Sequence, residues 1–564
     1  MADTGHGIIG QREQPFSVLF PLRTTPYPTD KLLGLSMMMK GDVDSVKDGP
    51  DPEENLWVPA GYTYFGQFVD HDLTFDSTSS LNLSEETDPG TRIPTNLRTP
   101  RLDLDCVYGD GPDAQPFMYA ADGATLLYGG TGQPVSQSNP DGLISTETAS
   151  WDLLRAPNGR AIIGDKRNDE NSIVCQIQLA MIKYHNAIVE RLRGEDPKKW
   201  NAPNQLFASA RNEVRWTYQQ IVVEDFLPRI ISEKVLAGLQ GLTREQRADN
   251  YVLYDTETMR KNLPREFVVA AYRYGHSGVR TGYRLNTTTR LSIFQSSEQM
   301  DQSTDSLLGF DPLPKHHVID DWGRFFPDTG PGHDINLRDR VAADDTPRPA
   351  PRLQYAYKLD PTIVDPLGVL PPGVAGNDAT LQARKQIEPA MFPNPDRPSL
   401  ALLNLLRGNT YRVVGGQTIA AALELAGKGD VKLRPDELVV RMSSKKKPAG
   451  READTASAFQ WVQIDESLQT DTPLWFYVLA EAQAPIVRAI EGDRDRIFLE
   501  TDLLNGPGAR TQLGWVGGRI VAEVIYGILD KDPESYVNAK KPDGWKPRLA
   551  GDGTPSMRNL LEFR

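Results

Sequence analysis

The segment GQFVDHD, residues 66–72, constrains the fold of this 564-residue chain more than any other stretch. In a helix, Gln67 and His71 are four residues apart and therefore share one face. Asp70 and Asp72 flank the histidine and point about 100° to either side of it. Acids around a histidine beside aromatic residues are costly in an ordinary core. The segment is therefore either an exposed acidic helix end or part of a functional site.

A second segment, TPRLDLDCVYG at residues 99–109, carries oxygen-bearing side chains at regular spacing. Thr99, Asp103 and Asp105 alternate with backbone carbonyls in an extended loop. Calcium takes six to eight oxygen ligands, so this spacing suits it. Acid-rich loops are common, however, and the spacing is not that of an EF-hand. The segment alone does not decide between a cation site and an acidic surface loop.

The third segment is GDKRNDE, residues 164–170, at the expected start of a helix. Arg167 and Glu170 are three residues apart and can face the same way. The ordinary interpretation is a helix N-terminus with favourable acids in its first turn.

Apolar residues at helical spacing predict a mainly α fold with long irregular loops. The motifs taken together favour a single large helical domain. The predicted helices begin near 61 and cover about 168–193, 203–227 (ended by Pro228), 264–276, 398–407, 417–426, 472–491 and 517–529. We expect an irregular N-terminal arm at 1–55, the domain at 56–535 and a C-terminal extension packed on it at 536–564. The segment 300–375 is expected to be loop-dominated. The segment 427–457, which contains Lys445, Lys446 and Lys447, is expected to be an exposed excursion.

Composition excludes several classes of partner. The net charge is −14, with 76 acidic and 62 basic residues, which disfavours nucleic acid or an anionic membrane surface. No apolar run is long enough to span a bilayer. The first residues do not resemble a secretory signal, so a cytoplasmic or non-classically secreted protein is expected. Cys106 and Cys175 are expected to be buried free thiols, as in a reducing compartment.

Seven histidines are present, and each taken singly is an ordinary structural or surface residue. His6 lies in the arm, and His316, His317 and His333 lie in the loop-rich middle. His71, His185 and His276 lie in predicted helices. The pattern HExxH and paired CxxC units are absent from the sequence, which disfavours a structural zinc.

The order of five motifs is more specific than any one of them. They are GQFVDHD (66–72), TPRLDLDCVYG (99–109), GDKRNDE (164–170), AYRYGH (271–276) and LNLLR (403–407). Together they resemble the animal-type haem peroxidases of the peroxidase–cyclooxygenase superfamily. The resemblance covers about residues 55–530 and is looser in the C-terminal third. The lack of disulfides and of a signal suggests a bacterial relative.

The resemblance implies a haem b site with His71 as the distal base. It further implies Arg167 as the distal cation, with Gln67 ordering water or a small anion. His276 would be the axial ligand of the haem iron, with Asn404 on its other ring nitrogen. Arg273 and Arg407 would pair with the haem propionates.

The resemblance also implies a calcium site and covalent haem links. Calcium would be held by Asp72, Thr99, the carbonyl of Arg101, Asp103 and Asp105. Asp70 and Glu170 match the carboxylates that form esters with haem methyl groups. Asn171 stands where one relative has a methionine, so a sulfonium link is not expected.

The implied activity is that of a peroxidase, which reduces hydrogen peroxide and oxidises small donors such as phenols, halides or thiocyanate through a ferryl intermediate. A fatty-acid dioxygenase of the same superfamily is an alternative, but the position of its radical-forming tyrosine holds Arg273 here. A second alternative is a peroxinectin-like adhesion or binding protein, since residues 40–42 read Lys-Gly-Asp. The oligomeric state cannot be predicted.

Overall fold

The structure is a computed structural model that describes most of the chain. The described residues are 14–42, 51–75, 95–129, 150–254, 262–296, 305–328, 352–371, 398–429, 431–448, 450–454, 456–489, 497–499, 502 and 510–563. His6 and His333 lie outside them. Helices predominate among the described residues, which confirms the predicted mainly α fold.

Eight helices of eight or more residues are found in the described part of the chain. They are α1 (Thr29–Met39), α2 (Gly61–Leu73), α4 (Ser172–Glu195), α5 (Pro203–Ile221), α12 (Leu400–Thr410), α13 (Gly416–Leu425), α14 (Leu474–Ala489) and α15 (Trp515–Lys531). The shorter α-helices are α3 (Asp105–Tyr108), α6 (Leu227–Ile230), α7 (Glu233–Leu236), α8 (Arg244–Ala248), α9 (Arg265–Val269) and α16 (Met557–Leu561).

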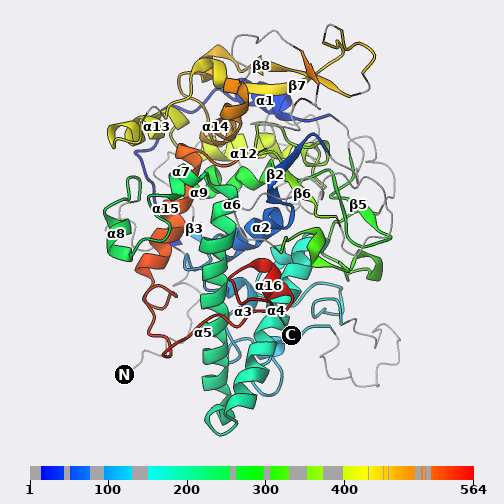
Figure 1. Cartoon of the computed structure of the whole chain (residues 1–564), viewed down its shortest axis with the longest axis vertical. Helices are drawn as coiled ribbons and strands as arrows, with labels where there is room; N and C mark the ends of the chain where they lie inside the picture. Colours follow the sequence, from blue (N-terminus) through cyan, green and yellow to red (C-terminus); the bar gives the residue numbers. More distant parts are fainter. Residues whose placement is uncertain are drawn as a thin grey trace.

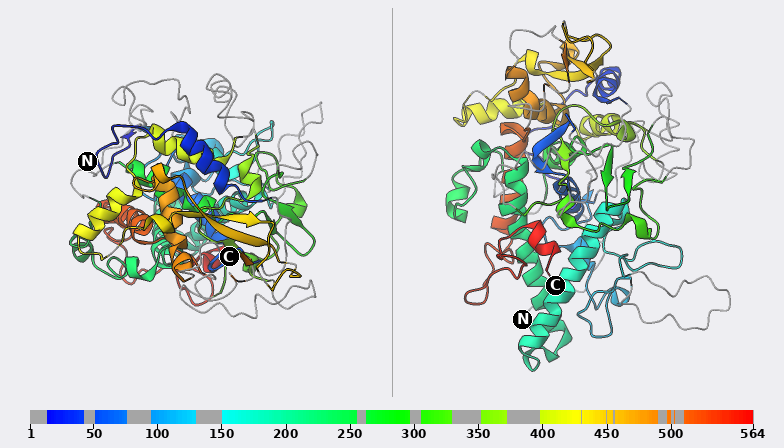
Figure 2. Two further views of the ribbon diagram at one scale, coloured as in Figure 1. Left: turned by 90° about the horizontal axis from the view of Figure 1, so that it is seen from above. Right: turned by 45° about the vertical axis from the view of Figure 1, so that its right-hand side comes forward.

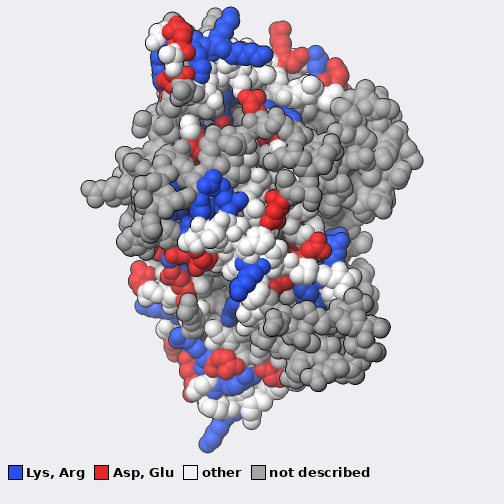
Figure 3. Space-filling model, turned by 90° about the vertical axis from the view of Figure 1, so that its right-hand side faces the viewer, with Lys and Arg blue, Asp and Glu red and all other residues white. Residues whose placement is uncertain are grey.

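The described strands form small antiparallel sheets. β1 (Gln14–Pro15) pairs with β3 (Thr95–Asn96), β2 (Glu54–Pro59) with β6 (Tyr355–Tyr357), and β4 (Gly282–Arg284) with β5 (Arg290–Ser292). β7 (Val439–Ser444), β8 (Ala458–Gln463) and β9 (Phe498–Leu499) form a three-stranded sheet. On the face shown in Figure 3, acidic and basic side chains of the described residues are interspersed.

Helix α2 lies in the middle of the molecule, with α4 and α5 beside it (Figure 1). α4 and α5 form a long pair that extends away from the rest of the molecule in Figures 1 and 2. α2 is held by its aromatic side chains, because the ring of Phe65 packs edge-on against Tyr218 and Phe226 at 6.0 and 5.5 Å. α2 also contacts β2, β6 and the 3-10 segment η6 (Ala271–His276). The GQFVDHD segment is therefore inside the core and not at an exposed helix end.

Several predicted boundaries were wrong for identifiable reasons. Pro228 does not end the helix that begins at Pro203, because a π-turn at Val222–Phe226 restarts the helix as α6 and places the proline in its first turn. The predicted helix 264–276 is broken at Ala270, whose φ and ψ are −134° and −75°. Asn171 caps the start of α4 with its side chain, so that helix begins at Ser172.

Two segments expected to be irregular are partly regular. The expected arm contains α1, whose Leu32, Leu35 and Met39 are buried at helical spacing, and α1 packs on α12. The expected excursion 427–457 contains β7, whose Val439 and Val440 are buried. The thiols of Cys106 and Cys175 are free and buried, as expected. Within the described residues, no helix combines the length and apolarity that crossing a membrane requires.

The start of α2 is tightly packed around Gly61, so an added side chain there should destabilise the protein. A Cβ at Gly61 would lie 2.6 Å from the Phe325 carbonyl oxygen and 2.5 Å from the Phe326 ring. We expect Gly61→Ala to lower the free energy of unfolding by about 1–3 kcal/mol, because the backbone must shift. Gly194→Ala is the matched control, since an added Cβ there meets no atom within 4 Å. Equal Tm values for the two variants in thermal unfolding would contradict this packing.

Candidate active site

His71 is a buried histidine on α2 whose tautomer is set by its neighbours. Its Nδ1 lies 2.7 Å from Oδ1 of Asn168, and Nδ2 of Asn168 donates to Oε1 of Gln178 at 2.8 Å. The second contact orients the amide, so Asn168 Oδ1 accepts the Nδ1–H proton of His71. Burial and the charge of Arg167 lower the pKa of His71 to about 4. His71 is therefore neutral at neutral pH and carries its lone pair on Nε2.

The Arg167 side chain is anchored at the C-terminal end of α2. Its guanidinium forms an ion pair with Asp165 at 2.8 Å and donates to the carbonyls of His71 and Thr74. It also lies over the ring of Phe75, 4.8 Å from the centroid. The guanidinium thus contacts Asp165, backbone carbonyls and Phe75, and its charge helps to lower the pKa of His71.

Gln67 joins α2 to the GDKRNDE segment. Its Nε2 donates to Glu170, and its Oε1 accepts from Nδ2 of Asn171 at 3.2 Å. Burial raises the pKa of Glu170 to about 7, with the charges of Asp165 and Asp70 adding to this and that of Arg167 opposing it. Asp70 accepts from the Thr74 hydroxyl at 3.1 Å and is half-buried, as are Gln67 and Glu170. The structure therefore places Gln67 against Glu170, with Asp70 near enough to raise the pKa of Glu170.

His276 ends the 3-10 segment η6, which packs against α2. Its Nδ1 lies 2.8 Å from Nδ2 of Asn404 on α12. Burial, with the charges of Arg273 and Arg407, lowers the pKa of His276 to about 3, so the ring is neutral. An asparagine amide can present either of its polar atoms to Nδ1. A metal bond through Nε2 requires the orientation in which Oδ1 accepts the Nδ1–H proton.

The surroundings of His276 fit a large planar cofactor. The histidine is half-buried, whereas the preceding residues Tyr272 and Tyr274 are buried. A Cβ added at Gly275 would meet no described atom within 4 Å. Arg273 and Arg407 are also half-buried, and both lie near enough to affect the ring electrostatically. Two cations beside an accessible imidazole suit an iron porphyrin with two carboxylates.

Three carboxylates converge beside α2, the helix that carries His71. Asp72, Asp103 and Asp105 each direct an oxygen into a cluster whose members lie within 4.8 Å of one another. Asp72 is fully buried, and neither of its carboxylate oxygens meets hydrogen-bond geometry with any described residue. Burial raises the pKa of Asp72 well above its usual range, and the charges of Asp105 and Asp103 raise it further. This donor set fits a hard divalent cation.

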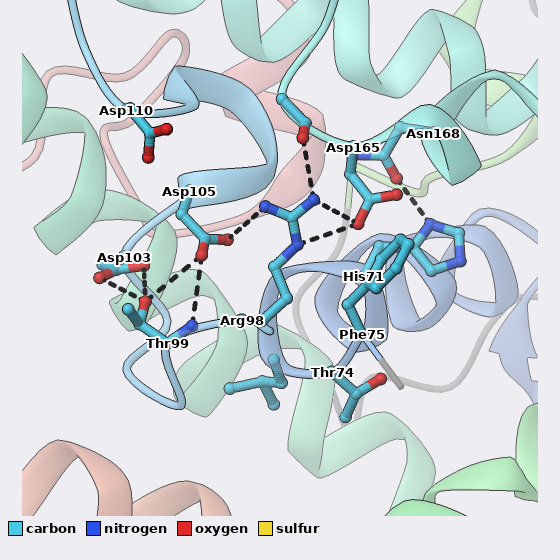
Figure 4. A network of polar contacts seen from close by, with 12 residues as sticks. His71, Thr74, Phe75, Arg98, Thr99, Asp103, Asp105, Asp110, Asp165 and Asn168 are labelled. Carbon is cyan, nitrogen blue, oxygen red and sulfur yellow. Dashed lines mark hydrogen bonds and ion pairs between the residues drawn. The ribbon is translucent and has the colours of Figure 1, made fainter. Parts of the chain in front are cut away.

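The loop around the carboxylates is shaped for this convergence (Figure 4). The Thr99 hydroxyl donates to Asp103 at 2.8 Å, and the Thr99 backbone N–H donates to Asp105 at 3.3 Å. Leu102 and Leu104 adopt φ values of +54° and +61°, the left-handed region that non-glycine residues rarely occupy. The loop thus holds strained backbone where its acids turn inward.

The remaining predicted ligand is the carbonyl of Arg101. It accepts a 3.4 Å hydrogen bond from Nε2 of Gln219, which also donates to the carbonyl of Leu102 at 3.0 Å. Gln219 lies on α5, so this helix supports the turn that carries the acids.

Sequence reasoning missed Arg98, which joins the carboxylate cluster to the distal residues. Its guanidinium bonds Asp165 at 2.7 Å and the Gly164 carbonyl at 2.8 Å, and its Nη1 lies 3.4 Å from Asp105 (Figure 4). Burial alone would raise the pKa of Asp165, but Arg167 and Arg98 hold it well below the usual range. The signal in the sequence was a lone arginine directly before the TPRLDLD motif.

Comparisons with known proteins agree with this arrangement. The family model for animal haem peroxidase matches residues 76–313, which include the Thr99–Asp105 loop, Arg167 and His276. A peroxidase-like protein from Margaritifera margaritifera is 27% identical over 265 residues, 39% of this chain and 31% of that protein. Heme peroxidase 2 from Caenorhabditis elegans is 24% identical over 201 residues, 36% of this chain and 26% of that protein. The match therefore spans about a third or less of these relatives.

The fold is also that of a haem peroxidase. Peroxidase A from Dictyostelium discoideum superposes with a TM-score of 0.50 at 14% identity, over 93% of this chain and 90% of that one. The chain therefore resembles the animal haem peroxidases in sequence over residues 76–313 and in fold over most of its length. Members of this family typically bind haem. This similarity leaves open both peroxidase and fatty-acid α-dioxygenase activity.

The contact between His71 and Asn168 should control how fast the haem-loaded protein binds cyanide. Hydrogen cyanide must lose its proton to bind ferric haem, so its binding rate reports the basicity of His71 Nε2. We expect Asn168→Val to slow cyanide binding by roughly tenfold or more, because the tautomer is no longer fixed.

The matched variant is Asn168→Asp, which keeps an acceptor at Nδ1 and should retain rapid binding. Stopped-flow absorbance measures both rates, with haem content determined on the same samples. Unchanged cyanide binding in Asn168→Val would show that His71 does not depend on this contact.

Proposed function

We propose that this protein is a haem-dependent peroxidase that reduces hydrogen peroxide and oxidises small donors such as phenols, halides or thiocyanate. The observation that carries the proposal is the pair of neutral histidines, His71 and His276, each held at Nδ1 by an asparagine amide. Within the described residues, no group hydrogen-bonds to Nε2 of either ring. One ring is thus suited to accept a proton and the other to ligate a metal.

The distal residues would act on peroxide by moving one proton. Nε2 of His71 takes a proton from hydrogen peroxide and returns it to the departing oxygen, which leaves as water. Arg167, held against Asp165, places a permanent positive charge near the imidazole and stabilises negative charge on that oxygen. Gln67, fixed by Glu170 and Asn171, orders the water beside them. Bound haem would supply the electrons for the reaction.

The proximal residues would hold and orient the cofactor. His276 would ligate the iron through Nε2, with Oδ1 of Asn404 accepting its Nδ1–H proton. The amide is uncharged, so the ring gains less anionic character than it would from a carboxylate. Arg273 and Arg407 would pair with the propionates.

Two alternative functions have less support. In a fatty-acid dioxygenase, a tyrosine three residues before the axial histidine carries the radical, and that position is Arg273 here. For an adhesion protein, the Lys40-Gly41-Asp42 tripeptide would have to be available. Lys40 instead pairs with the buried Asp365 at 3.0 Å, and the Gly41 N–H donates to the Ile363 carbonyl at 2.7 Å.

The main test compares two reactions on one haem-loaded preparation. We expect turnover of hydrogen peroxide with a phenolic donor, and little oxygen uptake with unsaturated fatty acids. His276→Ala should lose its haem and this turnover, whereas His316→Ala, an exposed histidine, should keep both. Rapid regiospecific lipid oxygenation with negligible phenol oxidation would instead favour the dioxygenase.

We also propose calcium at the Asp72, Asp103 and Asp105 cluster, completed by Thr99 and the Arg101 carbonyl. The support is the convergence of buried carboxylates whose mutual repulsion a divalent cation would relieve. Because Asp72 follows His71 directly, the ion would hold the end of α2 in place. Its role would be structural.

We expect calcium removal to destabilise the folded protein. Chelation should lower the Tm by several degrees and loosen haem, because only the native state binds the ion tightly. Asp103→Asn should weaken calcium binding, whereas Asp110→Asn, in the turn that follows α3 and outside the cluster, is the matched control. A calcium-free preparation with the same Tm and haem content as the untreated protein would contradict this role.

Ester links through Asp70 and Glu170 are a further part of the proposal. Both acids are half-buried beside the distal residues, and each is near enough to influence the other's charge. A carboxylic acid would bond to a haem methyl carbon while hydrogen peroxide accepts two electrons and becomes two waters. We expect haem to resist extraction into acidified organic solvent after peroxide treatment. The double variant Asp70→Val with Glu170→Gln should release all of it; full release from the unmodified protein would refute the links.

A further inference from the structure

A second group of potential metal ligands lies outside the proposed haem and calcium sites. Asp305, His316 and His317 direct ligand atoms to within 4.8 Å of one another. Nε2 of His316 lies 2.6 Å from Oδ2 of Asp305, and Nε2 of His317 lies 3.2 Å from Oδ1. The two imidazole rings are 4.5 Å apart and nearly perpendicular. Both rings therefore present a nitrogen to the same carboxylate.

His317, the buried member of the group, is held in place through its Nδ1 atom. Its Nδ1 lies 2.8 Å from the hydroxyl of Ser172, the first residue of α4. That hydroxyl also lies 3.4 Å from the Leu307 carbonyl, to which it can donate. A hydroxyl that donates to Leu307 accepts the Nδ1–H proton of His317, which puts the lone pair on Nε2. An outer partner of this kind fixes the ring of a metal-binding histidine.

The backbone that carries the two histidines is also fixed. Nδ2 of Asn286 donates to the carbonyls of His316 and Val318 at 2.8 and 2.9 Å. Nε2 of Gln176 donates to the His317 carbonyl at 3.0 Å, and its Oε1 accepts from the Ile319 N–H at 2.8 Å. The ligands would therefore lose little conformational freedom on binding an ion.

The chemistry of the three ligands selects a class of ion. Two imidazoles and one carboxylate suit zinc and other first-row divalent transition ions, whereas calcium and magnesium prefer oxygen alone. The side chains of Asp305 and His316 are 49% and 54% exposed, so an ion can enter and water can complete its coordination. We propose that Asp305, His316 and His317 form a zinc-type divalent transition-metal site on the surface of this protein.

The site would join two segments beside the candidate active site. The strand-like residues after Asp305 pair with the start of α4, since the Ser172 N–H donates to the Leu307 carbonyl and the Gly309 N–H to the Glu170 carbonyl. An ion held by Asp305 and both histidines would fasten this stretch to the 315–317 turn. The proposal is independent of haem and of peroxidase activity.

The test uses zinc alone with untagged, haem-loaded protein that has been saturated with calcium. Isothermal titration should give one zinc per chain, and X-ray absorption at the zinc edge should show two imidazole ligands. His316→Ala should weaken zinc binding by more than about tenfold, since even an outer partner of a ligand contributes that much. Asp311→Asn, an exposed acid in the same loop, should bind zinc like the unmodified protein.

Three outcomes would overturn the proposal. They are the absence of stoichiometric zinc binding, binding that His316→Ala leaves intact, and an absorption spectrum without imidazole ligands. In each case the group would be a hydrogen-bonded pair of histidines around an acid. Because His316 is exposed, its variant should fold, and its far-ultraviolet circular dichroism would verify this.

Discussion

The burial of the Asp72 carboxylate directly after His71 is the constraint on which the rest of the site depends. A fully buried carboxylate beside two other carboxylates is costly unless a cation or a proton compensates its charge. Asp103 and Asp105 add two more negative charges to the same place, so the loop from Thr99 can stay folded only around a positive charge or around protons. The position of His71 therefore depends on whether the charge of Asp72, the next residue, is compensated.

Arg98 and Asp165 extend that constraint to the other side of His71. Arg98 reaches both Asp105 and Asp165, and Asp165 in turn holds Arg167. The carboxylate cluster and the distal cation are thus the two ends of one chain of alternating charges. A change in the occupancy of the cluster would be transmitted through Arg98 to the orientation of Arg167. An ion at the proposed calcium site would thus influence the electrostatics of the proposed proton transfer without touching His71 or Arg167.

Most of the long helices could be predicted because apolar residues recur every three or four residues, as Ile173, Ile177 and Met181 do in α4. The β7–β8 hairpin could not, because three lysines next to β7 hide the buried pair Val439 and Val440. The candidate site residues were predicted through motifs, and the structure places Asn404 in contact with His276. The contacts of His71 with Asn168 and of Arg98 with Asp165 were missed, since neither spacing nor composition shows which distant side chains meet.

Each histidine of the proposed active site contacts an asparagine through its Nδ1 atom. These contacts affect how the site could change by mutation. Asparagine and aspartate codons differ at a single base. One mutation at residue 168 or 404 would therefore replace a neutral partner with an anionic one while preserving an acceptor for the Nδ1 proton. The basicity of the distal ring and the electron donation of the proximal ring could each be adjusted separately in this way. Two independent single-nucleotide changes could thus alter the basicity of the distal ring and the redox properties of a haem bound by the proximal ring.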